Sequence, residues 1–387
     1  MLLKEVTDKK TEKEFHEVNV LINRHDPNYI RPLIQDVQAV FDPKKNKAFR
    51  NGEAVRWVLK NESGDLVGRI AAFVNKKYKT KGDDGPVGGL GFFECIDSQE
   101  AADMLFDVGK HWLLQRGMTA MDGPINFGER ERWWGLLVDG FIPPLYCMNY
   151  NPSYYRKLWE NYGFKPFFHQ YCYGLDARKR LPEKLYRRHA DVEHDPAFSA
   201  RHIRKNQLST FAADFTEIYN KAWAGHGGLK QMKKDQVLAM FNTMKPVMDE
   251  KIVWFAYHEE QPVAFFVNIP DLNQWFRHLN GRFDWLGKLK FLWLKATRRC
   301  TKFNGLVFGV VPEFQGKGLD AYIIIEAARV IQPQTAYTDY ELQWIGDFNP
   351  VMINVARSIG ETFQTRELIT YRYLFDRTAA FKRHPIL

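Results

Sequence analysis

The chain has 387 residues, which exceeds the size at which one hydrophobic core usually stops growing, so two domains of similar size are expected. Apolar residues make up 45% and charged residues 26%, a balance that is typical of a folded globular protein and excludes a disordered chain. The formal net charge of +9 fits a polyanionic cofactor or an acidic substrate. Basic residues concentrate at 178–188 and 277–302, and because neither segment carries a recognised nucleic-acid motif, a nucleic-acid partner is disfavoured.

The first residues and the cysteines bear on the cellular compartment. Residues 1–15 carry charge where a signal peptide needs an apolar stretch, and no segment reaches the length of a transmembrane helix. The four cysteines show neither a CxxC spacing nor a companion His cluster, which argues against a zinc site and a disulfide framework. We therefore expect a cytoplasmic protein without a metal. The cysteines are Cys95, Cys147, Cys172 and Cys300.

The first half of the chain predicts a β-hairpin, then a strand that leads into an amphipathic helix, then a short helix. A glycine-containing turn separates the two strands of the hairpin, and Gly163 ends the short helix. In chain order the elements are a strand from Trp57, a turn at 62–65, a strand at 67–75, a strand at 89–96, a helix at 99–116 and a helix opened by Asn151-Pro152.

The second half repeats this order. Trp57 and Trp254 are 197 residues apart, and Asn151 and Asn349 are 198 residues apart, so two independent landmarks share one spacing. This spacing favours duplication of one fold, an α+β sheet layered by helices. In chain order the elements are a strand at 254–256, a turn at 258–261, strands at 263–268 and 305–311, a helix at 319–331 ended by Pro333, a strand at 336–344 and a helix from Asn349-Pro350 to Gly360.

The most informative string is 311–320, Val-Pro-Glu-Phe-Gln-Gly-Lys-Gly-Leu-Asp, between a predicted strand and a predicted helix. Gly316 and Gly318 let the backbone turn tightly, so that successive N–H groups converge at a helix N-terminus. The helix dipole and the Lys317 ammonium favour a diphosphate there, and the missing glycine side chains let it approach the backbone. Taken alone, a Gly-Lys-Gly turn is equally compatible with an ordinary loop.

In this position the string resembles motif A of the GNAT superfamily of N-acetyltransferases, Gln/Arg-x-x-Gly-x-Gly/Ala after the fourth strand. Gln315 and Gly318 match the motif, whereas Asp320 stands where the family has Gly or Ala and would repel a diphosphate. Nearly the whole chain resembles large bacterial tandem proteins of this superfamily, through the strings 26–29, 91–94, 135–141 and 270–273.

The resemblance implies two tandem GNAT-like domains, each a mixed sheet flanked by helices. The first is a degenerate N-terminal domain at 1–176, and the second is a C-terminal domain at 201–387 that binds acetyl-CoA or another acyl-CoA. A charged linker at 177–200 joins them. The N-terminal copy is called degenerate because Asp97 and Glu100 occupy its would-be phosphate site. The coenzyme would contact Val310, Val311, Gln315, Gly316, Lys317, Gly318, Leu319, Asp320 and Asn349. The alternative for Asn349 is a helix cap.

The implied reaction is acyl transfer to a small-molecule or peptide amine by direct attack in a ternary complex, with a strand-four amide at Val310 or Val311 as oxyanion donor. On the strand at 336–344, Asp339 and Glu341 point to one side, and burial of Glu341 is expected to raise its pKa for work as a general base. Its alternative role is a carboxylate paired with Lys or Arg.

The tyrosine acid of many GNAT enzymes is missing, because counting seven residues from Asn349 gives Ala356. Tyr371 and Tyr373 on the closing strand are candidates to replace it, and core packing is the alternative for both.

The segment 273–302 is an insertion in which tryptophan, phenylalanine and leucine alternate with lysine and arginine, opposed only by Asp284. It predicts packing across the seam between the domains, with an amphipathic lid and a peripheral membrane contact as alternatives.

Two other functions remain open at this point: an aminoacyl transferase that uses charged transfer RNA, and a protein that binds acyl-CoA without catalysis.

Overall fold

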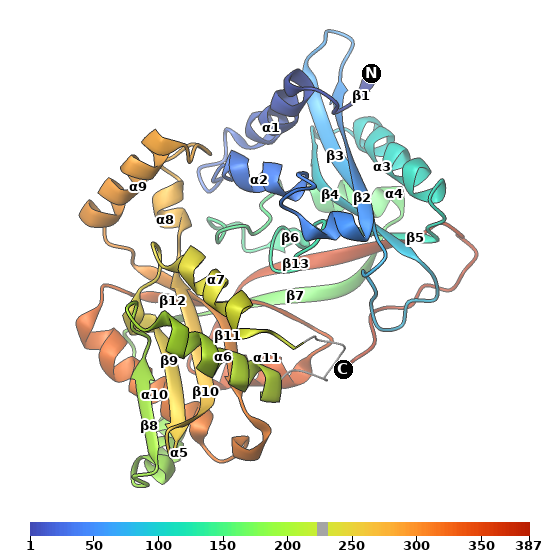
Figure 1. Cartoon of the computed structure of the whole chain (residues 1–387). Helices are drawn as coiled ribbons and strands as arrows, with labels where there is room; N and C mark the ends of the chain where they lie inside the picture. Colours follow the sequence, from blue (N-terminus) through green and yellow to red (C-terminus); the bar gives the residue numbers. More distant parts are fainter. Residues whose placement is uncertain (223–230) are drawn as a thin grey trace.

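The computed structural model describes residues 1–222 and 231–387. In these residues the chain forms one continuous sheet of 13 strands, with helices on both of its faces (Figure 1). The N-terminal and C-terminal halves of the chain form the two ends of this sheet. The mixed α+β architecture predicted from the sequence is confirmed.

The elements follow the predicted order along the chain. The strands are β1 (Leu2–Glu5), β2 (Gly52–Lys60), β3 (Leu66–Asn75), β4 (Val87–Cys95), β5 (Ala120–Gly123), β6 (Leu136–Asp139), β7 (Lys165–Asp176), β8 (Phe198–His202), β9 (Val253–His258), β10 (Gln261–Pro270), β11 (Lys302–Val310), β12 (Asp339–Gly346) and β13 (Phe363–Leu374). The helices are α1 (Lys9–Asn23), α2 (Ile34–Val40), α3 (Gln99–Leu114), α4 (Tyr155–Tyr162), α5 (Glu183–Glu193), α6 (Leu208–Ala222), α7 (Lys234–Met244), α8 (Asn273–Phe276), α9 (Trp285–Thr297), α10 (Leu319–Gln334) and α11 (Pro350–Ser358).

Three predicted segments differ in detail from the structure. Pro333 lies inside α10, and the helix ends one residue later at Gln334, so the expectation that Pro333 ends it was wrong. A proline in the last turn removes a single N–H donor, which a helix end tolerates better than its middle does. The predicted linker at 177–200 contains α5, and the insertion at 273–302 contains α8 and α9.

Both halves repeat one strand pattern. Each has an antiparallel meander, β1-β2-β3-β4 or β8-β9-β10-β11, whose last strand then pairs in parallel with the next, β5 or β12. A helix crosses over between the two parallel strands, α3 in the first half and α10 in the second. The repeat inferred from the two landmarks in the sequence is therefore present in the fold.

The last strand of each half belongs to the other half's part of the sheet. The order across the centre is β5-β13-β7-β12, so β13 lies beside β5 and β7 lies beside β12. Figure 1 shows these two strands side by side through the middle of the molecule. Because the last strand of each half is inserted next to strands of the other, neither half completes its part of the sheet by itself.

Strand β3 shows why the sheet carries helices on both faces. Ile70 and Ala72 pack into one core together with α3 and α4, whereas Ala71 and Phe73 pack into a second core together with α1 and α2. Successive side chains of a strand point to opposite faces, so an uninterrupted apolar run needs cover on both. The C-terminal half has one large core that includes residues of α5, α6, α7 and α10.

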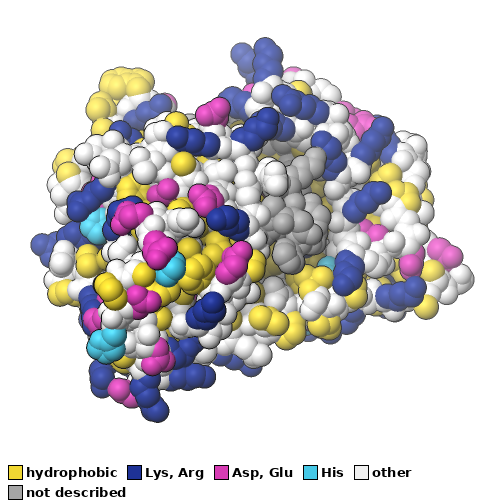
Figure 2. Space-filling model, turned by 60° about the horizontal axis from the view of Figure 1, so that its bottom comes forward, with side chains coloured by type: hydrophobic (Ala, Val, Ile, Leu, Met, Phe, Trp, Pro, Cys, Tyr) yellow, Lys and Arg dark blue, Asp and Glu magenta, His cyan; other side chains and the backbone are white. Residues whose placement is uncertain are grey.

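The surface is rich in cations. On the face drawn in Figure 2, lysine and arginine side chains are distributed over the surface and do not merge into one patch. No helix in the described part of the chain combines the length and the hydrophobicity needed to cross a bilayer.

A buried ion network fixes the exchanged strands. Arg366 on β13 has no exposed surface, and its Nε and Nη2 atoms donate to the two carboxylate oxygens of Glu341 on β12 at 2.7 and 3.1 Å. Its Nη2 also donates to the carbonyl of Pro143, 3.2 Å away in the first half of the chain. Lys302 on β11 is the second cation on Glu341. The network therefore ties three strands and both halves together.

Asp271 lies beside this network at the end of β10. It is 8% exposed, and its carboxylate accepts the Asn273 N–H at 3.1 Å. Burial raises the pKa of Asp271 to about 6, against the attraction of Lys302. At neutral pH the buried carboxylate is therefore ionised at a cost in folding free energy.

We expect Arg366→Met to destabilise the fold by about 3–5 kcal/mol, because it removes one of the two cations that pair with the buried Glu341 carboxylate. Urea unfolding measures the change. In the double variant Arg366→Met, Glu341→Gln, much of the loss should be recovered, since the buried charge is removed with its partner. A single variant within about 1 kcal/mol of the wild type would contradict this account.

We expect Asp271→Asn to stabilise the protein at pH 8 and to leave its stability unchanged at pH 4. The folded-state pKa of Asp271, about 6, lies above its ordinary value of 3.8. The folded state therefore binds the Asp271 proton more tightly than the unfolded state does, and the stability gained in this way is complete below pH 4 and is lost as the pH rises through 6. The difference at pH 8 should reach about 3 kcal/mol by urea unfolding. Asp97→Asn, at an exposed carboxylate, is the control; an equal gain at both pH values would contradict the assignment.

Candidate coenzyme-binding site

Strands β11 and β12 diverge and leave a gap in the sheet. They pair only from Lys302↔Asp339 to Gly305↔Leu342, although β11 continues to Val310 along β10. On its other edge β12 pairs with β7 from Asp339 as far as Gly346, so beyond Leu342 it pairs with β7 alone. The last five residues of β11, 306–310, therefore have no strand partner on the β12 side among the described residues.

The Val310 backbone amide faces this gap. The Val311 N–H donates to the Val263 carbonyl on the β10 side at 2.9 Å. Because successive amides in a strand point to opposite edges, the N–H and C=O of Val310 are directed toward the gap. The Val310 carbonyl accepts the Gln315 side chain at 3.0 Å. Of the two residues predicted as oxyanion donors, Val310 has the suitable orientation, whereas the Val311 amide is already used.

The loop after β11 ends in an uncapped helix N-terminus. Gly316 and Gly318 adopt left-handed backbone conformations, with φ of 77° and 85°, and Gly318 is the N-cap of α10 without a side-chain hydrogen bond. The N–H groups of 319–321 in the first turn donate to no carbonyl or side chain in the described part of the chain. These donors and the Lys317 ammonium have the arrangement that the sequence predicts for anion binding.

The two glycines of the loop differ in their surroundings. A Cβ added at Gly316 would meet no atom within 4 Å, whereas one added at Gly318 would lie 2.7 Å from the backbone carbonyl of Arg188 on α5. The open side of the loop is therefore at Gly316. The expectation that Gly318 leaves room for a phosphate needs correction, because the α5 backbone occupies that space.

Asp320 is neutralised by a residue that the sequence did not single out. Arg188 on α5 donates from Nη1 and Nη2 to the two carboxylate oxygens of Asp320, at 2.9 and 2.5 Å. The departure from the GNAT motif thus places an ion pair beside the phosphate loop instead of an unpaired negative charge. No local sequence signal connects Arg188 with Asp320, because 132 residues separate them.

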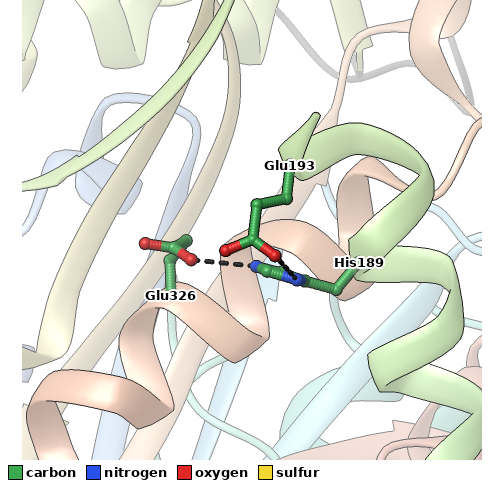
Figure 3. A group of neighbouring side chains, drawn as sticks. All are labelled: His189, Glu193 and Glu326. Atoms are coloured by element: carbon green, nitrogen blue, oxygen red, sulfur yellow. Dashed lines mark hydrogen bonds and ion pairs between the residues drawn. The ribbon is translucent and has the colours of Figure 1, made fainter. Parts of the chain in front are cut away.

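A second ion cluster holds α5 against α10 (Figure 3). The buried ring of His189 faces two carboxylates, with Nε2 at 2.9 Å from Glu326 and Nδ1 at 3.4 Å from Glu193. A carboxylate oxygen of each glutamate also lies 2.7 Å from a guanidinium nitrogen of Arg329. Such a His and Glu grouping resembles a metal-ligand set, but Arg329 already pairs with both glutamates, and the cluster bridges the two helices.

Glu341 is the buried partner of Arg366 and Lys302, and Thr365 donates to it at 2.9 Å. Burial by itself would raise the pKa of Glu341, but the charges of Arg366 and Lys302 outweigh burial and lower it. The expectation of a raised pKa was wrong, and the geometry favours the alternative of a paired structural carboxylate. Glu341 also lies where β11 and β12 still pair, opposite Asn304.

The two candidate tyrosines pack into the first half of the molecule. Tyr371 is fully buried, and its hydroxyl donates to Glu160 of α4 at 2.9 Å. Burial, and to a smaller extent this hydrogen bond, raise the pKa of Tyr371. The Tyr373 ring lies 5.1 Å from the Tyr162 ring, also on α4. The strand exchange carries both away from the second half, and these contacts match the core-packing alternative. Asn349 caps α11 by accepting the Met352 N–H at 3.2 Å.

The corresponding position in the first half is closed. The Ser98 hydroxyl caps α3 by accepting the Ala101 N–H, and the chain after β5 continues beside β4, where the Ile125 N–H donates to the Leu90 carbonyl at 2.8 Å. A Cβ at Gly91 would lie 2.0 Å from the Ile125 carbonyl, so no gap opens there. This closure favours the predicted degenerate role of the N-terminal copy.

No protein-family model matches the chain. It is 27% identical over 355 residues to a protein named "Bacterial ceramide synthase" from Caulobacter vibrioides, covering 90% of this chain and 91% of that one. It is also 24% identical over 348 residues to Protein YghO of Escherichia coli, covering 87% and 86%.

Two solved structures share the architecture. A tandem GNAT protein from the clavulanic acid biosynthesis pathway superposes with a TM-score of 0.56 at 10% identity, covering 98% of this chain and 100% of that chain. The GCN5-related glucosamine N-acetyltransferase region of a fungal β-N-acetylglucosaminidase superposes with a TM-score of 0.54 at 12% identity. The match covers 96% of this chain and 38% of that longer chain. The chain therefore has the fold of the GNAT superfamily, the GCN5-related N-acetyltransferases, in a tandem arrangement.

Proposed function

We propose that this chain is an acyl-CoA-dependent N-acyltransferase with its coenzyme site in the C-terminal half. The observation that carries the proposal is the gap between β11 and β12, with the Val310 amide directed into it and the free amides of the α10 N-terminus at the end of the same strand. The acyl-pantetheine arm would enter the gap, and its diphosphate would bind at 316–321. The cytoplasm, where acyl-CoA is available, is the compartment that we propose.

In this proposal the amine attacks the thioester carbonyl directly. The Val310 N–H donates to the carbonyl oxygen as it becomes an oxyanion, a contribution that strengthens in the transition state. The tetrahedral intermediate then expels the coenzyme thiolate, which takes up a proton. No covalent acyl-enzyme is required, and the four cysteines, all buried, are not suited to form one.

We further propose that the acceptor is a long-chain amino alcohol of the sphingoid class, and that the product is a ceramide-type amide. The support is the likeness to the Caulobacter protein named as a ceramide synthase, which extends over nine tenths of both chains. A ceramide is a long-chain base whose amine carries an acyl group, so its formation is the acyl transfer that the fold supports.

Coenzyme A is expected to raise the melting temperature of the protein, because a ligand at 100 times its dissociation constant stabilises by about 2.7 kcal/mol. Lys317→Glu should weaken binding roughly tenfold by placing a negative charge beside the diphosphate. Lys4→Glu, the same charge change at an exposed site on β1, should have no effect. The absence of any thermal or calorimetric signal with millimolar coenzyme A would overturn the proposed site.

Incubation with palmitoyl-CoA and sphinganine should release free coenzyme thiol and yield the N-acyl product in equal amounts, measured by a thiol reagent and by mass spectrometry. A short amine such as ethanolamine is the comparison. Turnover of ethanolamine but not of sphinganine would retain the acyltransferase and overturn the acceptor class. Coenzyme binding without turnover of any amine would favour the non-catalytic alternative.

A further inference from the structure

Helix α9 exposes a continuous hydrophobic face to solvent. Five large apolar side chains on it are more than half exposed, which is unusual for a folded domain. They are Trp285 (69%), Leu286 (58%), Leu289 (56%), Leu292 (55%) and Trp293 (57%). At 100° per residue these positions fall within about 120° of the helix circumference, so they form one stripe. This stripe is the outer face of α9.

The inner face of α9 holds the helix in place without help from the outer face. Phe291 and Leu294 are 3% and 1% exposed, and the Phe291 ring lies 5.9 and 5.6 Å from the rings of Trp275 and Phe276, both on α8. Phe276 in turn contacts Tyr146 of the first half, with ring centroids 5.3 Å apart. The predicted packing at the seam is therefore made by the inner face, and the exposed stripe has no partner among the described residues.

The charges around the outer face are almost all positive. Lys290 on one side, and Lys288 and Lys295 on the other, border the stripe at helical spacing. The only acid between 277 and 299 is Asp284, which caps α9 by accepting the Gly287 N–H at 2.9 Å. The seven cations of this segment are Arg277, Arg282, Lys288, Lys290, Lys295, Arg298 and Arg299.

The positive region continues beside α9. Lys295, Arg298 and Arg299 line an open cavity of about 430 Å³ that Lys205 and Lys251 also border. The five cations of this cavity outnumber its two acids, of which Glu250 accepts the Lys205 N–H and Asp249 accepts the Tyr337 hydroxyl. The side of the protein around α9 therefore offers cations that are suited to phosphate groups.

We infer that the outer face of α9 docks the protein on the surface of an anionic phospholipid bilayer. Leucine and tryptophan side chains enter the boundary between headgroups and acyl chains, and lysine and arginine remain at the phosphates. At 13 residues, or roughly 20 Å, α9 is too short to span the bilayer and lies along it. Figure 1 shows α9 at the periphery of the molecule, where a flat surface can reach it.

The phosphate loop lies at the end of β11 that is remote from α9. Strand β11 begins at Lys302, a few residues after α9, and reaches the gap at Val310, roughly 25 Å farther along. The inference rests on the surface of α9 alone and does not require the acceptor proposed above.

Sedimentation with sonicated vesicles tests the inference on the full-length protein. Vesicles of phosphatidylglycerol and phosphatidylcholine at 1:3 should bind the wild type, and pure phosphatidylcholine should bind it at least tenfold more weakly. The triple variant Trp285→Gln, Leu289→Gln, Trp293→Gln should lose binding at least tenfold with an unchanged melting temperature. The matched control is Leu2→Gln, Leu114→Gln, which removes two apolar side chains that are 53% and 45% exposed in the first half.

A charge variant separates the two contributions. Lys288→Gln should weaken binding to the anionic vesicles about fivefold and leave the weak binding to phosphatidylcholine unchanged. The inference is overturned if the wild type does not bind anionic vesicles at low ionic strength, or if the triple variant binds as well as the wild type. It is also overturned if gel filtration shows that the wild type and the matched control are dimers and the triple variant is a monomer. A second copy of the chain would then cover this face.

Discussion

The ion pair between Arg366 and Glu341 determines how the two halves of this molecule meet. Both side chains are completely buried, and a buried guanidinium without its carboxylate would cost several kcal/mol, so β13 can lie only where Glu341 is within reach. The same arginine contacts the carbonyl of Pro143 in the first half, and the same glutamate contacts Lys302 at the start of β11. The position of β13, the join between the halves and the closed end of the β11–β12 gap therefore depend on one network.

Because of the strand exchange, the position of a residue in the chain order does not tell which half of the sheet it joins. In an unexchanged domain, β13 would take the place beside β12 that β7 occupies here. In this chain β13 carries Tyr371 and Tyr373 to α4 of the first half. The tyrosines occupy the expected place in the chain order but a different place in the sheet.

The sequence predicted the features that depend on local pattern. The hairpins, the crossover helices, the repeat of about 200 residues and the Gly316–Gly318 turn all follow from the spacing of apolar residues and glycines, and the structure contains them. The exchange could not be predicted, because β7 and β13 have the same apolar pattern whichever sheet they join. The pairing of Arg188 with Asp320 and the reversed pKa of Glu341 escaped prediction for a related reason, since each depends on a partner that is distant in the sequence or on another strand.

The exchange also has a consequence for synthesis on the ribosome. Translation proceeds from the N-terminus, so β5 and β7 leave the exit tunnel long before β13, the strand that lies between them in the final sheet. During that interval the edge of β5 lacks its neighbour, and an exposed edge strand can pair with other chains. The first half therefore cannot complete its part of the sheet before β13 has emerged from the ribosome. Until then, the edge of β5 stays open unless a chaperone shields it.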